Sequence, residues 1–211
     1  MYVGRIVAVG RTKGGRVAGL YRVSSRSFPN RKAIVEKTKA IVVPKEGSEG
    51  TVLENAFITY DCARIVGKTA VVTNGSHTNP IAEKIASGMP IRDALALSLL
   101  ALDYEHDSLD TPRIAAVIER GAESGWLGVV RKDGIEVREV PLGKGEACYL
   151  ATYEISTIDP NRKDKFDVPS AKAGAKHIIN GGVFADLEKP VVAVCAFEKK
   201  GGFELADAMT A

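Results

Sequence analysis

The chain has 211 residues, of which 45% are hydrophobic and 26% charged, proportions close to those of an ordinary soluble domain. Its 29 Lys and Arg residues nearly balance 26 Asp and Glu residues, and a net charge of +3 does not indicate a nucleic-acid surface. No segment approaches the run of about 20 apolar residues that a membrane span needs. Residues 1–9 place Arg5 inside an apolar alternation rather than a signal peptide, so we expect a cytoplasmic protein with one domain over residues 1–211.

The amino-terminal third of the chain reads as an antiparallel sheet. Apolar and polar residues alternate there with the period of two that is typical of strands. Lys13-Gly14-Gly15 and Gly67-Lys68 suit hairpin turns, which join antiparallel neighbours. The predicted strands cover residues 2–9, 19–23, 39–43, 57–60, 63–66 and 69–73.

Helical signals follow. Asn79-Pro80 can cap and start a helix over residues 81–87, and an apolar stripe predicts a second helix over residues 91–104. Pro169-Ser170 can start a third helix, which runs to Asn180. The strand pattern resumes after the second helix and again after the third, at residues 114–118, 126–130, 135–140, 147–155 and 191–197.

The order of these elements favours an α+β fold. Strands joined by hairpins, with few parallel crossovers, predict two packed antiparallel sheets that carry helices on their outer faces. Residues 159–167 are rich in Lys, Asp and Arg, and we expect them to form a solvated connector. Cys62, Cys148 and Cys195 are widely spaced within apolar segments, which indicates buried reduced thiols rather than disulfides.

Residues 21–31 hold the densest group of hydrogen-bond donors in the chain. This segment contains three arginines, three serines and one asparagine. A guanidinium presents a planar fork that matches phosphate or carboxylate oxygens, and hydroxyl groups fill the remaining directions. The segment is therefore either an anion site or a solvated basic loop, and Pro29 favours the site slightly because it stiffens the loop.

Three further segments carry polar candidates. Tyr60 and Cys62 share one face of a strand, where a buried phenol needs a partner and can do general-acid work. Glu105 follows the second predicted helix at its carboxyl end, where a carboxylate opposes the helix dipole unless something else uses it. Residues 74–78 lie between a strand and a helix, a common place for ligand contacts, although each of these segments also has an ordinary structural interpretation. The three histidines, His77, His106 and His177, are far apart, and none has another histidine or cysteine at metal-ligand spacing, so no metal is expected.

Several of these segments together resemble the archaeal-type inosine monophosphate (IMP) cyclohydrolase family. The resemblance covers most of residues 1–118 and is weaker beyond residue 120. It rests on Met1-Tyr2-Val3-Gly4-Arg5 and on residues 21–31, 60–67, 72–78, 102–105 and 111–116.

The resemblance implies a hydrolase of purine biosynthesis. The family closes the ring of the formylated aminoimidazole carboxamide ribonucleotide to give IMP and water, without a cofactor, and its members form homotetramers. It also implies a four-layered αββα sandwich like that of the amino-terminal-nucleophile hydrolases. Residue 2 is Tyr, which offers no terminal nucleophile, so the fold would be shared while the chemistry is not. The expected partner is a small purine ribonucleotide, and neither nucleic acid nor membrane is expected.

The resemblance also assigns roles by hypothesis. Tyr60 would polarise the formyl oxygen or protonate the leaving hydroxyl, Glu105 would take or relay the carboxamide proton, and Arg31 would stabilise negative charge. The residues expected to bind the phosphate are Arg26, Ser24 and Ser25. Those expected to orient the base, carboxamide or ribose are Asn30, Asn74, Gly75 and Arg113. His77 has a lesser binding role, and Arg22 is unassigned.

Two other functions remain open from the sequence. The first is an amidohydrolase of the same fold that uses Cys62 as its nucleophile. The second is a nucleotide-binding module that uses the same arginines without catalysis.

Overall fold

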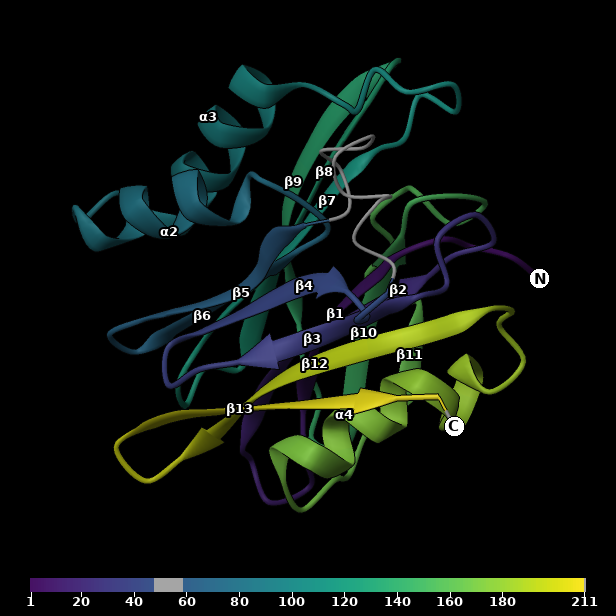
Figure 1. Ribbon diagram of the computed structural model, residues 1–211. Helices are drawn as coiled ribbons and strands as arrows, with labels where there is room; N and C mark the ends of the chain where they lie inside the picture. The colour runs from purple at the N-terminus through teal and green to yellow at the C-terminus, as the bar shows by residue number, and fades with distance from the viewer. Residues whose placement is uncertain (48–58, 211) are drawn as a thin grey trace.

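The computed structural model describes residues 1–47 and 59–210, which form two antiparallel sheets and three α-helices (Figure 1). The α+β class and the two antiparallel sheets are thus confirmed. Every strand pair within these residues is antiparallel, as expected for strands joined mainly by hairpins.

Sheet A has the strand order β11-β10-β1-β2-β12-β13, and sheet B has the order β3-β4-β5-β6-β7-β8-β9. The strands of sheet A are β1 Ile6–Arg11, β2 Val17–Ser24, β10 Glu146–Ala151, β11 Lys163–Lys165, β12 Pro190–Lys199 and β13 Gly202–Met209. Those of sheet B are β3 Arg31–Val35, β4 Lys39–Pro44, β5 Tyr60–Val66, β6 Thr69–Thr73, β7 Arg113–Glu119, β8 Ser124–Arg131 and β9 Gly134–Pro141.

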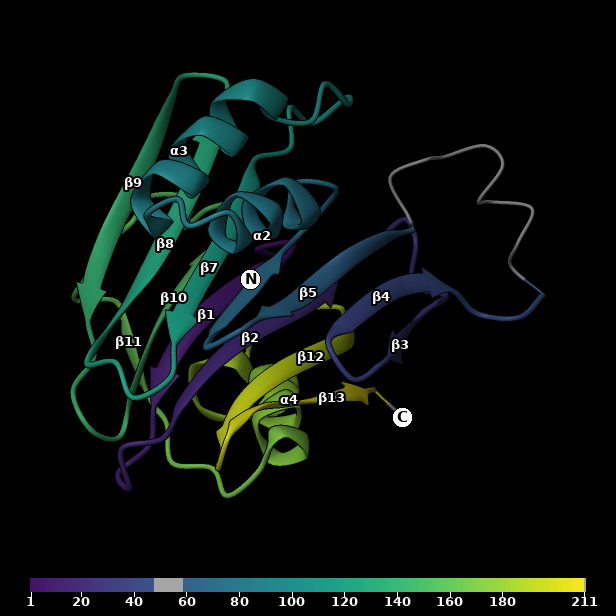
Figure 2. The same cartoon turned by 90° about the vertical axis from the view of Figure 1, so that its left-hand side faces the viewer.

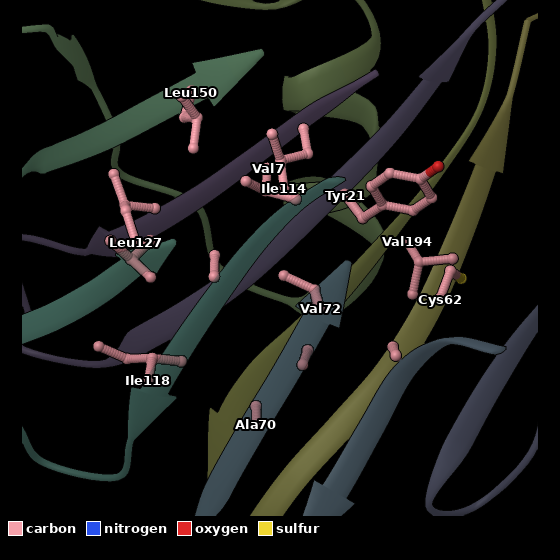
Figure 3. Close-up of a cluster of buried hydrophobic side chains, with 14 of the residues drawn as sticks. Val7, Tyr21, Cys62, Ala70, Val72, Ile114, Ile118, Leu127, Leu150 and Val194 are labelled. Atoms are coloured by element: carbon pink, nitrogen blue, oxygen red, sulfur yellow. The ribbon is translucent and has the colours of Figure 1, made fainter. Parts of the chain in front are cut away.

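The main hydrophobic core lies between the two sheets (Figure 3). Strand β2 shows how its sequence suits this position: Tyr21 and Val23 enter the core between the sheets, whereas Leu20 belongs to a second cluster on the other face of sheet A. Successive side chains of a strand point to opposite faces, so a strand that is covered on both sides must be apolar or paired throughout. All eight residues of β2 are buried.

Helices cover the outer face of each sheet (Figure 2). Helix α4, Ala171–Asn180, packs on β2, β12 and β13 of sheet A through Ala175 and Ile178. Helices α2, Thr78–Ala86, and α3, Ile91–Leu102, pack on sheet B through Ile81 and Leu95. The molecule is therefore layered in the order α2 and α3, sheet B, sheet A, α4.

Three strands depart from the sequence prediction. Strands β3 and β13 were not expected, and β11 lies within residues 159–167, which were expected to be a solvated connector. In β11, Asp164 is buried, accepts hydrogen bonds from the backbone N–H of Val183 and lies 2.8 Å from Nε2 of His177. All three are edge strands, and in β11 the exposed Lys163 and Lys165 flank the buried Asp164, which explains why this segment resembles a solvated connector.

Some boundaries also differ from the prediction. Helix α2 begins at Thr78 with His77 in the N-cap position, and the Asn79 side chain accepts a hydrogen bond from Arg64 instead of capping the helix. The predicted strand over residues 147–155 ends at Ala151. Of the strand predicted over residues 57–60, residues 57 and 58 lie outside the described residues, and Tyr60 begins β5, which continues to Val66.

Candidate active site

One end of the sandwich gathers most of the predicted site residues. In antiparallel sheets the start of one strand lies beside the end of the next, so the starts of β3, β5 and β7 and the ends of β2 and β6 share this end. Arg31, Tyr60 and Arg113 are each the first residue of a strand, and Asn74 directly follows one. Strand topology alone therefore brings together groups that are far apart in the sequence.

A pair of tyrosines links the two sheets at this end. The hydroxyl oxygens of Tyr21, on β2, and Tyr60, on β5, are 2.7 Å apart and form a hydrogen bond. Tyr21 is fully buried and Tyr60 retains 8% of its accessible surface. Burial raises the pKa of both phenols above the ordinary value, because it disfavours the charged form. Both therefore carry their protons at neutral pH.

Arg31 presents unpaired donors beside this pair. Its Nε donates to the backbone carbonyl of Phe28 at 3.0 Å, whereas Nη1 and Nη2 are buried without a hydrogen-bond partner among the described residues. Burial lowers the pKa of Arg31, while the nearby Tyr60 acts in the opposite direction. A buried donor without a partner costs free energy, which is typical of a group that waits for a ligand.

Arg5 joins this cluster, although the sequence reasoning gave it no site role. Its Nε is buried without a partner among the described residues. Burial alone would lower the pKa of Arg5, but the facing groups Tyr60, Tyr21, Glu105 and Tyr153 hold it above its ordinary value. The one sequence signal for this role was the position of an arginine inside the apolar alternation at the start of the chain, which by itself did not identify a site residue.

The turn before Arg5 requires glycine. Gly4 has a φ of +71°, and a Cβ at that position would overlap the Thr152 hydroxyl and the Tyr153 ring. The backbone of Arg5 is fixed next to this point, where its N–H donates to the Thr152 hydroxyl at 3.1 Å. The close approach of two segments thus directs Arg5 into the site.

Glu105 and Arg113 form a buried pair at the edge of the cluster. Nη1 of Arg113 lies 3.4 Å from Oε1 of Glu105, and Nε of Arg113 donates to the backbone carbonyl of Asp103 at 2.8 Å. Burial raises the pKa of Glu105, although the positive charges of Arg5, Arg113 and Arg31 oppose the shift. A carboxyl whose pKa burial raises is a better proton acceptor than an ordinary carboxylate, which suits a role in proton transfer.

Asn74, Gly75 and His77 line the same region. The Asn74 amide holds β7 in place, because Nδ2 donates to Pro112 and Oδ1 accepts from the Ile114 N–H. Gly75 lies so close to the ion pair that an added Cβ would be 3.0 Å from Nη1 of Arg113 and 3.3 Å from Oε1 of Glu105. A side chain at this position would require the ion pair to shift by a few tenths of an ångström.

His77 is a neutral acceptor in this cluster. Its Nε2 is 2.9 Å from the backbone carbonyl of Ile114, and because a carbonyl only accepts, Nε2 carries the proton. Burial lowers the pKa of His77 to about 3, and the Arg113 charge contributes to the shift. Nδ1 is then an acceptor, buried without a partner among the described residues and 3.5 Å from the position of a Cβ on Gly75.

The residues that were predicted to bind phosphate do not all lie beside Arg31 and Tyr60. Ser24 lies on the α4 side of β2, where its hydroxyl accepts from Nε of Arg22 at 2.9 Å. Ser25 accepts from the Phe28 N–H at 2.9 Å, and Asn30 is exposed. Ser24 is therefore not brought together with Arg31 and Tyr60, and its predicted contact with phosphate stays a prediction.

Arg26 lines a pocket next to the cluster. Its guanidinium lies over the Tyr2 ring at 4.2 Å and is 3.2 Å from a carboxylate oxygen of Glu188. The pocket has a volume of about 440 Å³ and is bordered by Tyr153, whose ring stacks on Tyr2 and whose hydroxyl faces the charge of Arg5. A separate pocket of about 500 Å³ near Trp126 contains none of the predicted site residues.

Cys62 lies in the core rather than in the site. It is fully buried, and its thiol donates to the backbone carbonyl of Ala40 at 3.4 Å. Burial raises the pKa of Cys62 far above that of a reactive thiol, so the nucleophilic thiolate is disfavoured. Within residues 1–47 and 59–210, no three His, Cys, Asp or Glu side chains meet to hold a metal ion, and no helix is long and apolar enough to span a membrane.

Chemically, the cluster combines buried cations with buried weak acids. Arg5 and Arg31 offer unpaired donors to an oxygen that gains negative charge, as oxyanion stabilisation requires. Tyr60 can donate a proton, and Glu105 can accept one. Such a set suits the addition of a nucleophile to a carbonyl followed by loss of water.

Comparison with known proteins identifies the family. A family model described as "IMP cyclohydrolase-like protein" matches residues 2–202. Proteins named IMP cyclohydrolase from Methanocella arvoryzae and Methanosphaera stadtmanae are 48% and 46% identical over 97% and 94% of this chain and 96% and 95% of their own lengths. One from Methanocaldococcus jannaschii is 40% identical over 98% of both chains. The resemblance noted in the sequence is therefore confirmed, and the chain belongs to the IMP cyclohydrolase-like family.

Proposed function

We propose that this chain converts 5-formamidoimidazole-4-carboxamide ribonucleotide to IMP and water, the last step of de novo purine biosynthesis. The observation that carries the proposal is the buried Arg31 guanidinium, whose unpaired Nη atoms lie beside the hydrogen-bonded hydroxyls of Tyr60 and Tyr21. Membership of the IMP cyclohydrolase-like family supports the same reaction.

The reaction is intramolecular. The carboxamide nitrogen attacks the formyl carbon, so a C–N bond forms and the formyl oxygen becomes a hydroxyl group. That hydroxyl then leaves as water, and its two protons come from the carboxamide nitrogen and the formamide nitrogen. Because both reacting groups sit on one imidazole ring, the protein's task is to orient them, stabilise charge on the oxygen and move protons, with no cofactor in the proposal.

The proposed catalytic groups are Tyr60, Glu105 and Arg31. Arg31 stabilises negative charge on the formyl oxygen, and Tyr60 gives that oxygen a proton. Glu105 takes the proton from the carboxamide nitrogen, a role supported by its raised pKa and by its position opposite the cations. Both Tyr60 and Glu105 pass protons on and end each turnover unchanged.

The proposed binding groups surround the catalytic ones. Arg26, which lines the 440 Å³ pocket, holds the phosphate, and Ser25 and Ser24 are the other proposed phosphate contacts. Arg113 and His77 contact the carboxamide or the base, and Nδ1 of His77 is suited to accept an N–H of the ligand. The remaining proposed contacts to base, carboxamide or ribose are Asn30, Asn74 and Gly75.

The proposal extends to architecture and assembly. The order of layers supports the four-layered sandwich of the amino-terminal-nucleophile hydrolases, with Tyr at residue 2 instead of a terminal nucleophile. We place the enzyme in the cytoplasm as a homotetramer. Leu97 and Leu100 of α3 expose apolar surface that a second copy could cover, and light scattering measures the assembly.

A direct assay tests the function. The purified chain should convert the formylated ribonucleotide to IMP, which is followed by absorbance and verified by chromatography. A chain that binds IMP but leaves the open-ring precursor unchanged after long incubation would be the non-catalytic binding module instead. Boiled protein and the precursor alone serve as controls for spontaneous closure.

Cys62→Ala separates the proposed enzyme from an amidohydrolase that uses this thiol. We expect the variant to close the ring at a rate within about threefold of wild type, since the Cys62 thiol is protonated and bonded to Ala40. Initial rates at saturating substrate check the expectation. Loss of all turnover in a folded variant, together with labelling of Cys62 that substrate blocks, would favour the amidohydrolase.

Arg31→Met should separate activity from stability. The variant loses an oxyanion donor, so the rate should fall by roughly 10²- to 10³-fold. It also removes two buried donors without partners, which offsets the lost hydrogen bond from Nε to Phe28, so the free energy of unfolding should change by about 1 kcal/mol or less. Urea unfolding and initial rates measure both. In the matched control Arg113→Met a paired guanidinium is lost, and stability should fall; equal losses of stability in both variants would contradict the interpretation of Arg31.

A further inference from the structure

The hydrogen bond between Tyr21 and Tyr60 has a direction that the buried setting determines. Tyr21 lies in the core between the sheets (Figure 3), and its hydroxyl has one hydrogen-bond partner among the described residues, the hydroxyl of Tyr60. If Tyr21 accepted this bond, its own proton would be buried without an acceptor. A buried hydroxyl seldom leaves its proton unpaired, so Tyr21 donates and Tyr60 accepts.

The proton of Tyr60 is then directed away from Tyr21. Tyr60 is the partly exposed member of the pair, and the charged groups next to it, Arg31 and Arg5, have no acceptor to offer. No second partner of the Tyr60 hydroxyl is found in the described part of the chain. Its O–H is therefore directed away from Tyr21, at the end of the sandwich where Arg31 and Arg5 lie, and a ligand oxygen there can receive it.

We propose that Tyr21 is a positioning residue, whose donated hydrogen bond aims the Tyr60 proton at the substrate and stabilises the Tyr60 phenolate once that proton has moved. The proposal rests on the proposed role of Tyr60 as the acid. In the step concerned, the O–H bond of Tyr60 breaks, a bond forms between the proton and the formyl oxygen, and the negative charge stays on the Tyr60 oxygen. The proton released from the carboxamide nitrogen restores Tyr60 through Glu105 or solvent.

The surroundings of Tyr60 support this assignment. Burial raises its pKa, whereas Arg31 on β3, Arg5 before β1 and the hydrogen bond from Tyr21 on β2 act in the opposite direction, and Cys62 on β5 adds to the rise. The pKa of Tyr21 is well above the ordinary value, so Tyr21 remains a donor when Tyr60 ionises. Two cations and one hydrogen bond thus favour the ionised form of Tyr60, whereas for Tyr21 only the charge of Arg5 acts in that direction and the hydrogen bond to Tyr60 raises the pKa.

Tyr21→Phe tests the proposal, because it removes one oxygen atom and keeps the ring that fills the core. We expect kcat to fall by roughly 10- to 100-fold, with KM and the dissociation constant of IMP within about twofold of wild type. Loss of the donated hydrogen bond raises the pKa of Tyr60, so the alkaline limb of the pH–rate profile should move to higher pH. Tyr149→Phe, which removes a phenol on the α4 side of sheet A, is the matched control and should change none of these.

A double-mutant comparison decides whether Tyr21 acts through Tyr60. If it does, adding Tyr21→Phe to Tyr60→Phe should change the residual rate by less than about twofold, because the group that Tyr21 serves is already gone. Equal fold losses in both backgrounds, or an unchanged pH profile in Tyr21→Phe, would overturn the proposal and leave the acid role of Tyr60 intact. A Tyr60→Phe variant with the wild-type rate would overturn both.

Discussion

Tyr60→Phe and Glu105→Gln should each slow ring closure by roughly 10²- to 10⁴-fold, the range that positioned acid and base groups contribute. Neither change creates a cavity of any size, since one loses a single oxygen and the other replaces one oxygen with nitrogen. Both variants should therefore fold and bind IMP. Initial rates at saturating substrate, with circular dichroism as a check on folding, measure the effect.

The pH–rate profile assigns the two roles. A base must be deprotonated, so if Glu105 is the base, activity falls as pH drops through the pKa of Glu105, which burial raises. An acid must be protonated, so if Tyr60 is the acid, activity falls as pH rises through the pKa of Tyr60. Glu105→Gln should then abolish the acidic limb and Tyr60→Phe the alkaline one.

Matched controls make this result specific. Tyr149→Phe removes a phenol from the far face of sheet A, and Glu123→Gln removes an exposed carboxylate paired with Arg11. Both controls should keep the wild-type rate and both limbs. Folded Tyr60→Phe and Glu105→Gln proteins with near wild-type rates would show that the reaction relies on other groups.

The sequence predicts much of the end of the sandwich that holds Tyr60, because the alternation of apolar and polar residues is enough to identify most of the strands there. Alternation shows that β2 and β5 are strands, and the antiparallel order brings their polar ends together. It also places Arg22 on the opposite face from Tyr21 and Val23, as the structure confirms. Tyr60 and Arg113 lie at the same end for this reason, whereas Arg31 begins β3, a strand that the alternation did not indicate.

What the sequence does not predict depends on contacts between distant segments. The partner of Tyr60 is Tyr21, 39 residues earlier and in the other sheet, and no local pattern identifies such a pair. The hydroxyl of Ser24 accepts a hydrogen bond from Arg22 on the α4 side of β2, a contact that the group of donors in residues 21–31 does not indicate, and its contact with phosphate stays a prediction. Arg5 was left without a role because its unpaired donor becomes evident only when the surrounding groups are in place.

Arg22→Met should produce the largest loss of stability, about 3–5 kcal/mol in the free energy of unfolding, because several buried carbonyls lose their donor at a cost of about 1–3 kcal/mol each. The Arg22 guanidinium is fully buried, and although burial lowers its pKa to about 10, it stays charged at neutral pH. It donates to five backbone carbonyls at the end of α4 and in the following loop, those of Ile178, Ile179, Phe184, Leu187 and Glu188. Methionine fills similar space but leaves these acceptors without a donor.

The loss should reach the ligand pocket as well, because the loop that Arg22 holds ends at Glu188, whose carboxylate contacts Arg26 and the amino terminus of Met1. Urea unfolding measures the stability, and the dissociation constant of IMP reports on the pocket. Arg16→Met, which removes a guanidinium 6.0 Å from the Phe197 ring, is the control and should change stability by about 0.5 kcal/mol or less. Lysine at residue 22 keeps the charge but has three donors for five carbonyls. The free energy of unfolding of Arg22→Lys should therefore lie between those of Arg22→Met and the wild type. An Arg22→Met protein within about 1 kcal/mol of wild type would mean that water replaces the lost donors, and the loop would then not depend on Arg22.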